Sequence, residues 1–277
     1  MKHTDTPRTQ NRLLRISNFA LIILAVGFFP DVRVVVAQEA PPAIGGVWST
    51  TVTAIEHPDW TIEDLFACNC TSETYEYLRE LLLPENDNLS ALDIQAAVST
   101  HNREAIRELY TETQIDYLAV YDHADDPSIQ CELFGVFRTL LHNDPILIEQ
   151  TQSQIIIRPE DLAADRIIHM DGRDHPENEP FTALGHSIGW YEGSTLVIDT
   201  VNIAASIAED GLNIHNADNA HAIERYTLSE DGTRLHGQFT LIDPVMFREP
   251  LVLERTRVFT PEVNLIDAPC ESISGEM

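Results

Sequence analysis

Short runs of apolar and β-branched residues, separated by turn residues, dominate the chain after Cys131. Asp-Gly or Glu-Gly pairs at 171–172, 192–193 and 231–232 are typical of tight turns between strands. The expected strands are 146–150, 155–158, 166–170, 186–191, 196–201, 220–228, 235–241 and 251–259. Consecutive strands with no helix between them predict an antiparallel meander. We expect it to be closed or curled into a lipocalin-like barrel, so that few edges are exposed; an open curved sheet with a helical layer is the alternative.

Residues 72–118 have a different periodicity. Leu92, Ala96, Ile106 and Leu109 recur near three- and four-residue steps, and Ser90 is a candidate N-cap. A first strand is expected before this region, at 46–54, with further strands after it. The fold class is therefore mainly β, with an α-helical insertion near residues 72–118 that caps one mouth of the barrel.

The first 37 residues have the pattern of an export signal. Arg8, Arg12 and Arg15 precede an apolar run at 19–29, and Val35-Val36-Ala37 offers a small-residue cleavage site. The run is shorter than the roughly 20 residues of a membrane-spanning helix. We therefore expect a signal peptide at 1–37, a single domain at 38–277, and a periplasmic or secreted protein with no membrane span after cleavage. An uncleaved anchor is the alternative.

The chain is strongly acidic, with a formal net charge of −28. Such a surface repels nucleic acid and anionic lipid, so we expect no nucleic-acid partner. The acidity serves solubility or, alternatively, attracts a cationic partner. Lys2 is the only lysine and lies in the expected signal. The mature chain therefore cannot form a lysine Schiff base, which excludes pyridoxal-phosphate and lysine-dependent aldolase chemistry.

Four cysteines in an exported chain predict disulfides. We favour a bridge between Cys131 and Cys270, while Cys68 and Cys70 join each other or stay reactive. No second Cys or His pair stands nearby at zinc-site spacing, so we assign no metal ligands.

A serine-hydrolase signature appears at Gly185–Gly189, which matches G-x-S-x-G. In α/β-hydrolases this motif places the serine on a turn between a strand and a helix. Here a hairpin follows instead of a helix. We therefore interpret Ser187 as part of a strand whose glycines allow bending or close packing.

The side chains best suited to chemistry are concentrated between residues 166 and 226. The catalytic candidates are His169, Asp171, His175 and His221, because an imidazole beside a carboxylate can act as a general acid or base. The ligand-binding candidates are Arg173, His186, His215 and Glu224. The planar guanidinium of Arg173 suits an anionic group; alternatively it pairs with an acid such as Asp174 or Glu224. We expect Glu224 and Arg225 to be an exposed or paired cross-strand couple.

Three motifs give the chain a resemblance. They are DGRDHP at 171–176, SIGWYEGSTLVIDT at 187–200, and HNADNAHAIERY at 215–226 followed by Asp243-Pro244. Over roughly residues 131–270 the sequence resembles a group of exported bacterial β-rich proteins with no established function. The resemblance implies no activity. This chain departs from the pattern at Ser194, where aspartate is common, and at Asn216, where serine is common.

Three functions fit these features. We expect an exported barrel protein that binds a small, mostly apolar ligand, with Arg173 and the histidines as polar contacts. An alternative is an enzyme on the same scaffold, an isomerase, lyase or hydrolase that uses His/Asp acid–base chemistry, with or without a metal. A third is an envelope interaction protein. The sequence identifies no cofactor, substrate or oligomeric state.

Overall fold

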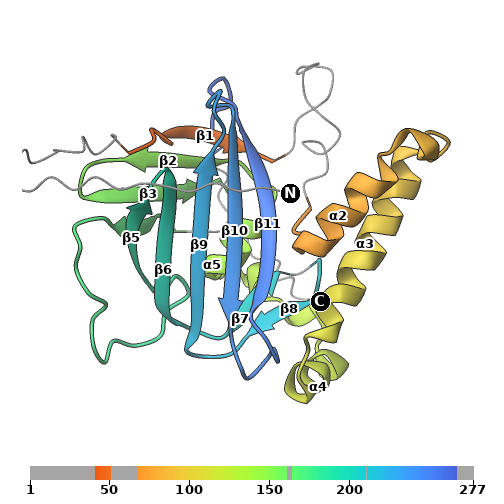
Figure 1. Cartoon of the computed structure of the whole chain (residues 1–277). Helices are drawn as coiled ribbons and strands as arrows, with labels where there is room; N and C mark the ends of the chain where they lie inside the picture. The colour runs from red at the N-terminus through yellow and green to blue at the C-terminus, as the bar shows by residue number, and fades with distance from the viewer. Residues whose placement is uncertain (1–40, 51–67, 161–163, 210, 267–277) are drawn as a thin grey trace, which may run out of the picture. The chain divides into compact units, whose positions relative to one another are not determined.

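A closed β-barrel forms the body of the protein in the computed structural model, which describes residues 41–50, 68–160, 164–209 and 211–266. Within these residues the barrel order is β1-β11-β10-β9-β6-β5-β4-β3-β2 (Figure 1). The strands are β1 Gly46–Ser49, β2 Ile146–Gln150, β3 Gln154–Pro159, β4 Arg166–His169, β5 His186–Glu192, β6 Thr195–Ile203, β9 Ala220–Leu228, β10 Arg234–Ile242 and β11 Leu251–Phe259. The mainly β, lipocalin-like barrel with a helical insertion is confirmed.

The strand pairing departs from a simple meander at two places. β4 pairs with β5 in parallel, with Ile168 opposite Ser187, so the turn at Asp171-Gly172 does not close a hairpin. This turn begins a long connection, which brings the chain back to the end of the barrel at which β4 starts, so that β5 runs in the same direction as β4. β6 pairs with β9 because a separate hairpin, β7 Ser206–Glu209 and β8 Ile214–Asn216, lies between them in sequence. The fully antiparallel meander was therefore wrong at β4–β5.

Side chains fill the inside of the barrel. Alternation along β9 buries Ala220, Ala222, Glu224 and Tyr226, as expected for a strand with one inward face. The helix α5, Val136–Leu141, adds six buried residues to the core. The hollow between α5 and the inner faces of β10 and β11 admits no water-sized sphere. These side chains do not support a ligand inside this part of the barrel, and the larger hollows lie elsewhere.

The expected helical insertion is present as three helices, α2 Ser72–Leu81, α3 Ala91–Glu108 and α4 Glu112–Val120. Short 3-10 helices lie at Pro84–Asn86, His123–Asp125 and Pro127–Gln130. The hydroxyls of Thr71, Ser90 and Thr111 accept hydrogen bonds from the first-turn backbone N–H groups of α2, α3 and α4. Ser90 was correctly identified as an N-cap, and Asp93 completes a capping box with it.

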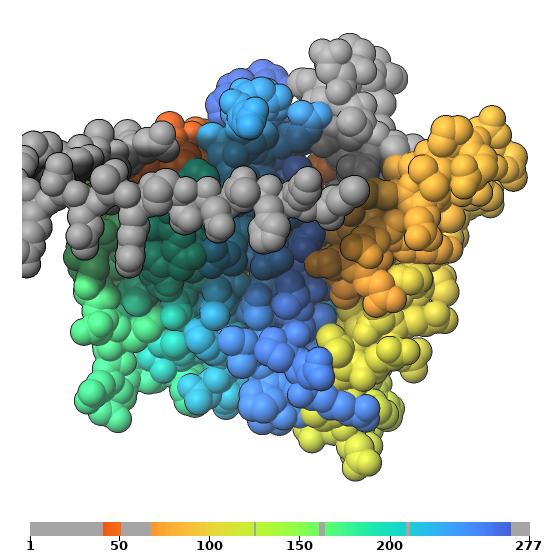
Figure 2. Space-filling model, viewed as in Figure 1, coloured from red at the N-terminus to blue at the C-terminus, as the bar shows by residue number. Residues whose placement is uncertain are grey.

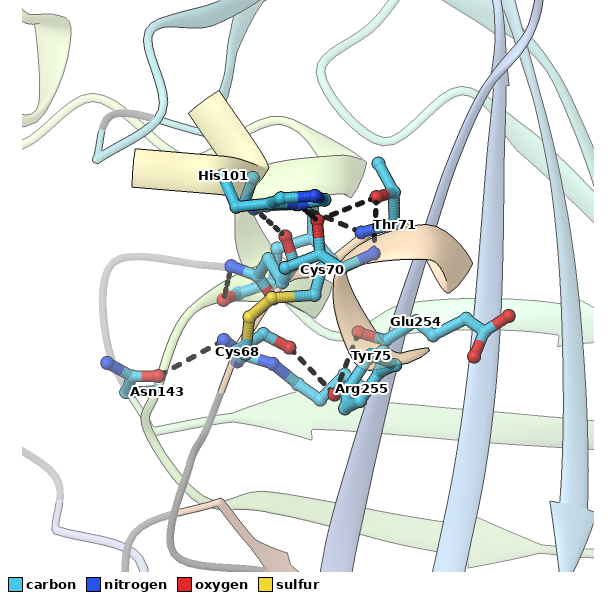
Figure 3. Close-up of a disulfide and its surroundings, with 12 residues drawn as sticks. Cys68, Cys70, Thr71, Tyr75, His101, Asn143, Glu254 and Arg255 are labelled. Carbon is cyan, nitrogen blue, oxygen red and sulfur yellow. Dashed lines mark hydrogen bonds between the residues drawn. A yellow bond between two sulfur atoms is a disulfide. The ribbon is translucent and has the colours of Figure 1, made fainter. Parts of the chain in front are cut away.

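A disulfide lies where the helices meet the barrel. Cys68 is bonded to Cys70, and Cys70 exchanges two backbone hydrogen bonds with Glu254 of β11 (Figure 3). The Tyr75 hydroxyl of α2 donates to the Cys68 carbonyl over 3.0 Å. Figure 2 shows α2 and α3, in orange and yellow, alongside the blue strands β10 and β11. The hydrogen bonds of Cys70 therefore hold the start of the helical insertion against β11, and the disulfide closes the short loop before α2.

The predicted second disulfide and the predicted export signal both involve residues that the structure does not describe. Cys131 is disulfide-bonded, and its favoured partner Cys270 lies outside the described residues. The expected signal at 1–37 also lies outside them, as does part of the first expected strand, 51–54. None of the described helices has the length and apolar character needed to cross a bilayer.

Candidate functional site

Four of the predicted residues meet on the outer face of the barrel. We call His169, His175, His186, His221 and Asp199 the outer histidine cluster. His186, Asp199 and His221 lie on β5, β6 and β9, and each is next to a buried residue that points inward. His175 comes from the long β4–β5 connection, and the ring of His169, at the end of β4, stacks on that of His186 with centroids 5.2 Å apart. Strand alternation places these side chains on one surface.

Hydrogen bonds connect most of the outer histidine cluster. His175 Nδ1 lies 2.9 Å from His186 Nδ1, and His221 Nε2 lies 2.6 Å from Asp199 Oδ1. His175 Nε2 is 3.5 Å from the same Asp199 oxygen. Because His175 faces its two neighbours with opposite ring nitrogens, these groups do not converge on one point. Among the described residues no group of three or more His, Cys, Asp or Glu is arranged to hold a metal ion.

The electrostatics of the outer histidine cluster keep Asp199 ionised. Burial acts to raise the pKa of this carboxyl, but the hydrogen bond and charge of His221, helped by His175, hold it below its usual value. Burial lowers the pKa of His186 and of His169, and the neighbouring histidines lower that of His186 further. The His221–Asp199 pair has the geometry of an oriented acid–base group.

Arg173 and Asp171 pair with each other in an exposed turn. Arg173 Nε donates to Asp171 Oδ1 over 2.9 Å and its Nη2 donates to Oδ2 over 2.6 Å. This pairing lowers the pKa of Asp171 to about 2. The ion-pair alternative for Arg173 therefore holds, although its partner is Asp171 and not Asp174 or Glu224.

Glu224 lies inside the barrel and not on its surface. Its carboxylate accepts hydrogen bonds from the Arg166 guanidinium and, over 2.9 Å, from the Tyr226 hydroxyl. Arg166 also donates to the hydroxyls of Ser187 and Thr200. The expected exposed Glu224–Arg225 couple was wrong, because alternation along β9 turns these two side chains to opposite faces. Arg225 pairs instead with Glu192 at 2.7 Å.

Ser187 has a structural role in this network. It is 2% exposed, and its hydroxyl lies 3.0 Å from that of Thr200 and accepts from Arg166. The structure thus places the serine of the G-x-S-x-G match in a buried strand beside an arginine, which agrees with the structural interpretation of the motif.

His215 lies on β8 of the β7–β8 hairpin, apart from the outer histidine cluster. It is 2% exposed, and neither ring nitrogen has a hydrogen-bond partner of good geometry among the described residues. Tyr117 of α4 and Tyr121, the C-cap residue of that helix, pack on its ring with centroids 4.4 and 4.8 Å away. Burial lowers the pKa of His215 to about 4, although the Asn213 carbonyl and the Asp126 carboxylate act in the opposite direction. The imidazole is therefore neutral at pH 7.

Two adjoining hollows lie beside the β7–β8 hairpin and α4. The histidine lobe, of about 350 Å³, is lined by residues that include Tyr117, Tyr121, Ile207, His215, Asn216 and Met246. The arginine lobe, of about 530 Å³, is lined by residues that include Arg103, Arg107, Tyr110, Leu118, Tyr121 and Leu212. Tyr121 belongs to both walls. We call the two lobes together the terminal pocket; none of its lining residues belongs to the outer histidine cluster.

The aromatic wall of the terminal pocket escaped the sequence analysis. Tyr117 and Tyr121 stand four residues apart, which places them on one face at the end of α4. This spacing was visible in the sequence. However, His215 is distant from α4 in sequence, and only the fold brings the two together.

Comparisons with known protein families, with characterised proteins and with solved structures gave no match.

Proposed function

We propose that this protein is exported and binds a small, mostly apolar molecule in the terminal pocket. The observation that carries the proposal is His215, a buried imidazole beside a hollow, whose two nitrogens have no hydrogen-bond partner of good geometry among the described residues. Burying polar atoms without partners destabilises a protein by about 1–3 kcal/mol per group. Protein atoms cover both nitrogens, so a ligand in the lobe must displace a neighbouring side chain to hydrogen-bond to them, and that hydrogen bond offsets this cost.

The chemistry of the histidine lobe indicates the type of ligand. A neutral imidazole offers one donor and one acceptor, which suits a hydroxyl or carbonyl group on the ligand. The rings of Tyr117 and Tyr121 and the side chains of Ile207 and Met246 give the rest of the wall an apolar character. Hollows of roughly 300–1,000 Å³ with apolar walls and few polar groups are typical small-molecule sites.

The test uses 2-naphthylacetamide, a neutral aromatic amide, and measures its dissociation constant by calorimetry. The variant His215→Phe keeps an aromatic ring and removes both nitrogens, so we expect it to weaken binding about tenfold, the value of one hydrogen bond. Ala205→Trp places a large ring in the wall of the histidine lobe and should abolish binding.

The matched control is His236→Phe. His236 is a surface histidine of β10, with its side chain 48% exposed and outside the terminal pocket. The His236→Phe variant should bind the amide with the same dissociation constant as the wild type. If wild-type protein does not bind the amide, or if all three variants bind it equally well, the proposal is wrong.

A second candidate function, acid–base catalysis, is favoured by the 2.6 Å contact between His221 and Asp199. Substrate hydrolysis or isomerisation would be sought with a panel of small esters and ketones. His221→Ala and Asp199→Asn should each abolish any turnover found, while His236→Ala should not. Turnover that survives both cluster variants would exclude this site.

A further inference from the structure

Arg103 and Arg107 stand one helical turn apart on α3. Residues four positions apart share one face of a helix, and both of these side chains line the arginine lobe. His123 lines the same hollow, with Tyr110 and Tyr121 close by. No Asp or Glu is among the described residues that line it, although the chain has 45 acidic residues. The arginine lobe is thus a cationic hollow in an acidic protein.

Neither arginine has an ion-pair or hydrogen-bond partner for its side chain within the described part of the chain. This distinguishes them from most other arginines of the barrel and its loops. Arg138, Arg158, Arg166, Arg173, Arg225 and Arg234 each pair with an acidic side chain. Two guanidinium groups on one helix face, with no acid among the described residues that line the hollow, can bind an anion through parallel N–H donors.

We infer that the terminal pocket takes an amphipathic anion, whose carboxylate or phosphate group is held by Arg103 and Arg107 and whose apolar part lies against Tyr121. Tyr121 forms a wall of both lobes, so a single molecule can contact the arginines and reach toward His215. The inference deepens the proposed function and rests on it, because it names the ligand class of the same pocket. The acidic remainder of the surface repels an anion elsewhere, so these arginines provide the local attraction.

The experiment compares ligands that share the naphthalene ring: 2-naphthylacetamide, which is neutral, 2-naphthylacetate and 2-naphthyl phosphate. We expect wild-type protein to bind at least one of the two anions about tenfold more tightly than the amide, because each exposed charge contact adds up to about 1 kcal/mol. The anion that binds more tightly distinguishes a carboxylate ligand from a phosphate ligand.

Charge variants locate the effect. Arg103→Gln/Arg107→Gln should remove the preference for the anions over the amide, so that all three ligands bind with similar affinity. Arg103→Lys/Arg107→Lys should keep part of it, because lysine retains the charge without the planar fork. Arg79→Gln on α2 lies outside the terminal pocket and should change neither affinity. Circular dichroism would confirm that the variants are folded.

The outcomes separate the two proposals. If the amide binds and both anions bind no more tightly, or if the glutamine pair keeps the anion preference, the inference fails and the proposed function stands. If wild-type protein does not bind the amide, the proposed function fails, and the inference that rests on it fails as well.

Discussion

The buried ion pair between Arg166 and Glu224 gives the sharpest test of the barrel interior. Their side chains are 2% and 0% exposed. Glu224→Leu removes the carboxylate and leaves the Arg166 guanidinium with only the hydroxyls of Ser187 and Thr200 as partners. An uncompensated buried charge of this kind destabilises a protein by about 3–5 kcal/mol. For a domain of this size that corresponds to a fall in Tm of roughly 6–20 °C.

The same reasoning predicts a rescue. Arg166→Met/Glu224→Leu/Tyr226→Phe removes both charges and the Tyr226 hydroxyl, while the hydroxyls of Ser187 and Thr200 remain 3.0 Å apart as partners for each other. Replacing buried ion pairs by apolar residues of similar volume is often neutral or stabilising. We therefore expect the triple variant to be more stable than Glu224→Leu by about 3 kcal/mol or more.

Urea unfolding followed by circular dichroism and tryptophan fluorescence measures both changes. Glu192→Leu is the control, because its ion pair with Arg225 is exposed and should contribute less than about 1 kcal/mol. The reasoning is refuted if Glu224→Leu costs no more than the control, or if the triple variant is no more stable than Glu224→Leu.

Three other predictions follow from the described geometry. Because the pKa of His215 is lowered to about 4, the unfolded chain binds a proton between about pH 6.5 and 4 that the folded chain does not. As the pH is lowered through this window, the free energy of unfolding of the wild type should fall relative to that of His215→Phe by up to about 3 kcal/mol. Urea midpoints of the two proteins that change in parallel with pH would contradict this prediction. Gly189→Ala places a Cβ 2.8 Å from a methionine sulfur and 2.9 Å from an isoleucine methyl, whereas Gly193→Ala, at φ +63°, meets no atom within 4 Å. Thermal unfolding should show a cost of about 1 kcal/mol for Gly193→Ala, from its backbone alone, and clearly more for Gly189→Ala; equal costs would exclude close packing at Gly189. Cys68→Ser/Cys70→Ser should cost about 1–2 kcal/mol, since the closed loop is short, and a calorimetric loss several times larger would show that the disulfide does more than restrict the unfolded chain.

The strands were predictable because their patterns are local. Alternation and turn residues gave 146–150, 220–228 and 251–259 with the bounds that the structure shows. α5 was missed, because Val136–Leu141 is buried on all sides and so has no helical periodicity to detect. The parallel β4–β5 pairing was missed for another reason. Asp171-Gly172 is a turn in either topology, and only the length of the following connection allows the chain to cross back.

The candidate site was harder to predict than the strands. Outward strand positions and one loop bring His169, His175, His186 and His221 together, a convergence that period-two alternation could suggest. The direction of Glu224 could have been read from alternation with Arg225, but its partner Arg166 lies on β4, which is not adjacent to β9 in the barrel. The terminal pocket depends on helix α4 contacting β8, and no local pattern encodes such a contact.

The pairing of β1 with β11 has a consequence for how the chain folds. Trp48 of β1 lies opposite Phe259 of β11, so the barrel is closed by pairing between strands from the two ends of the domain in sequence. Contacts so distant in sequence carry a large loop-closure cost and are typical of slow-folding β proteins. Until β11 has been synthesised, the edges of β1 and β10 have no partners and can pair with other chains. Almost the whole domain must therefore be present before its barrel can close, and aggregation competes with folding during that interval.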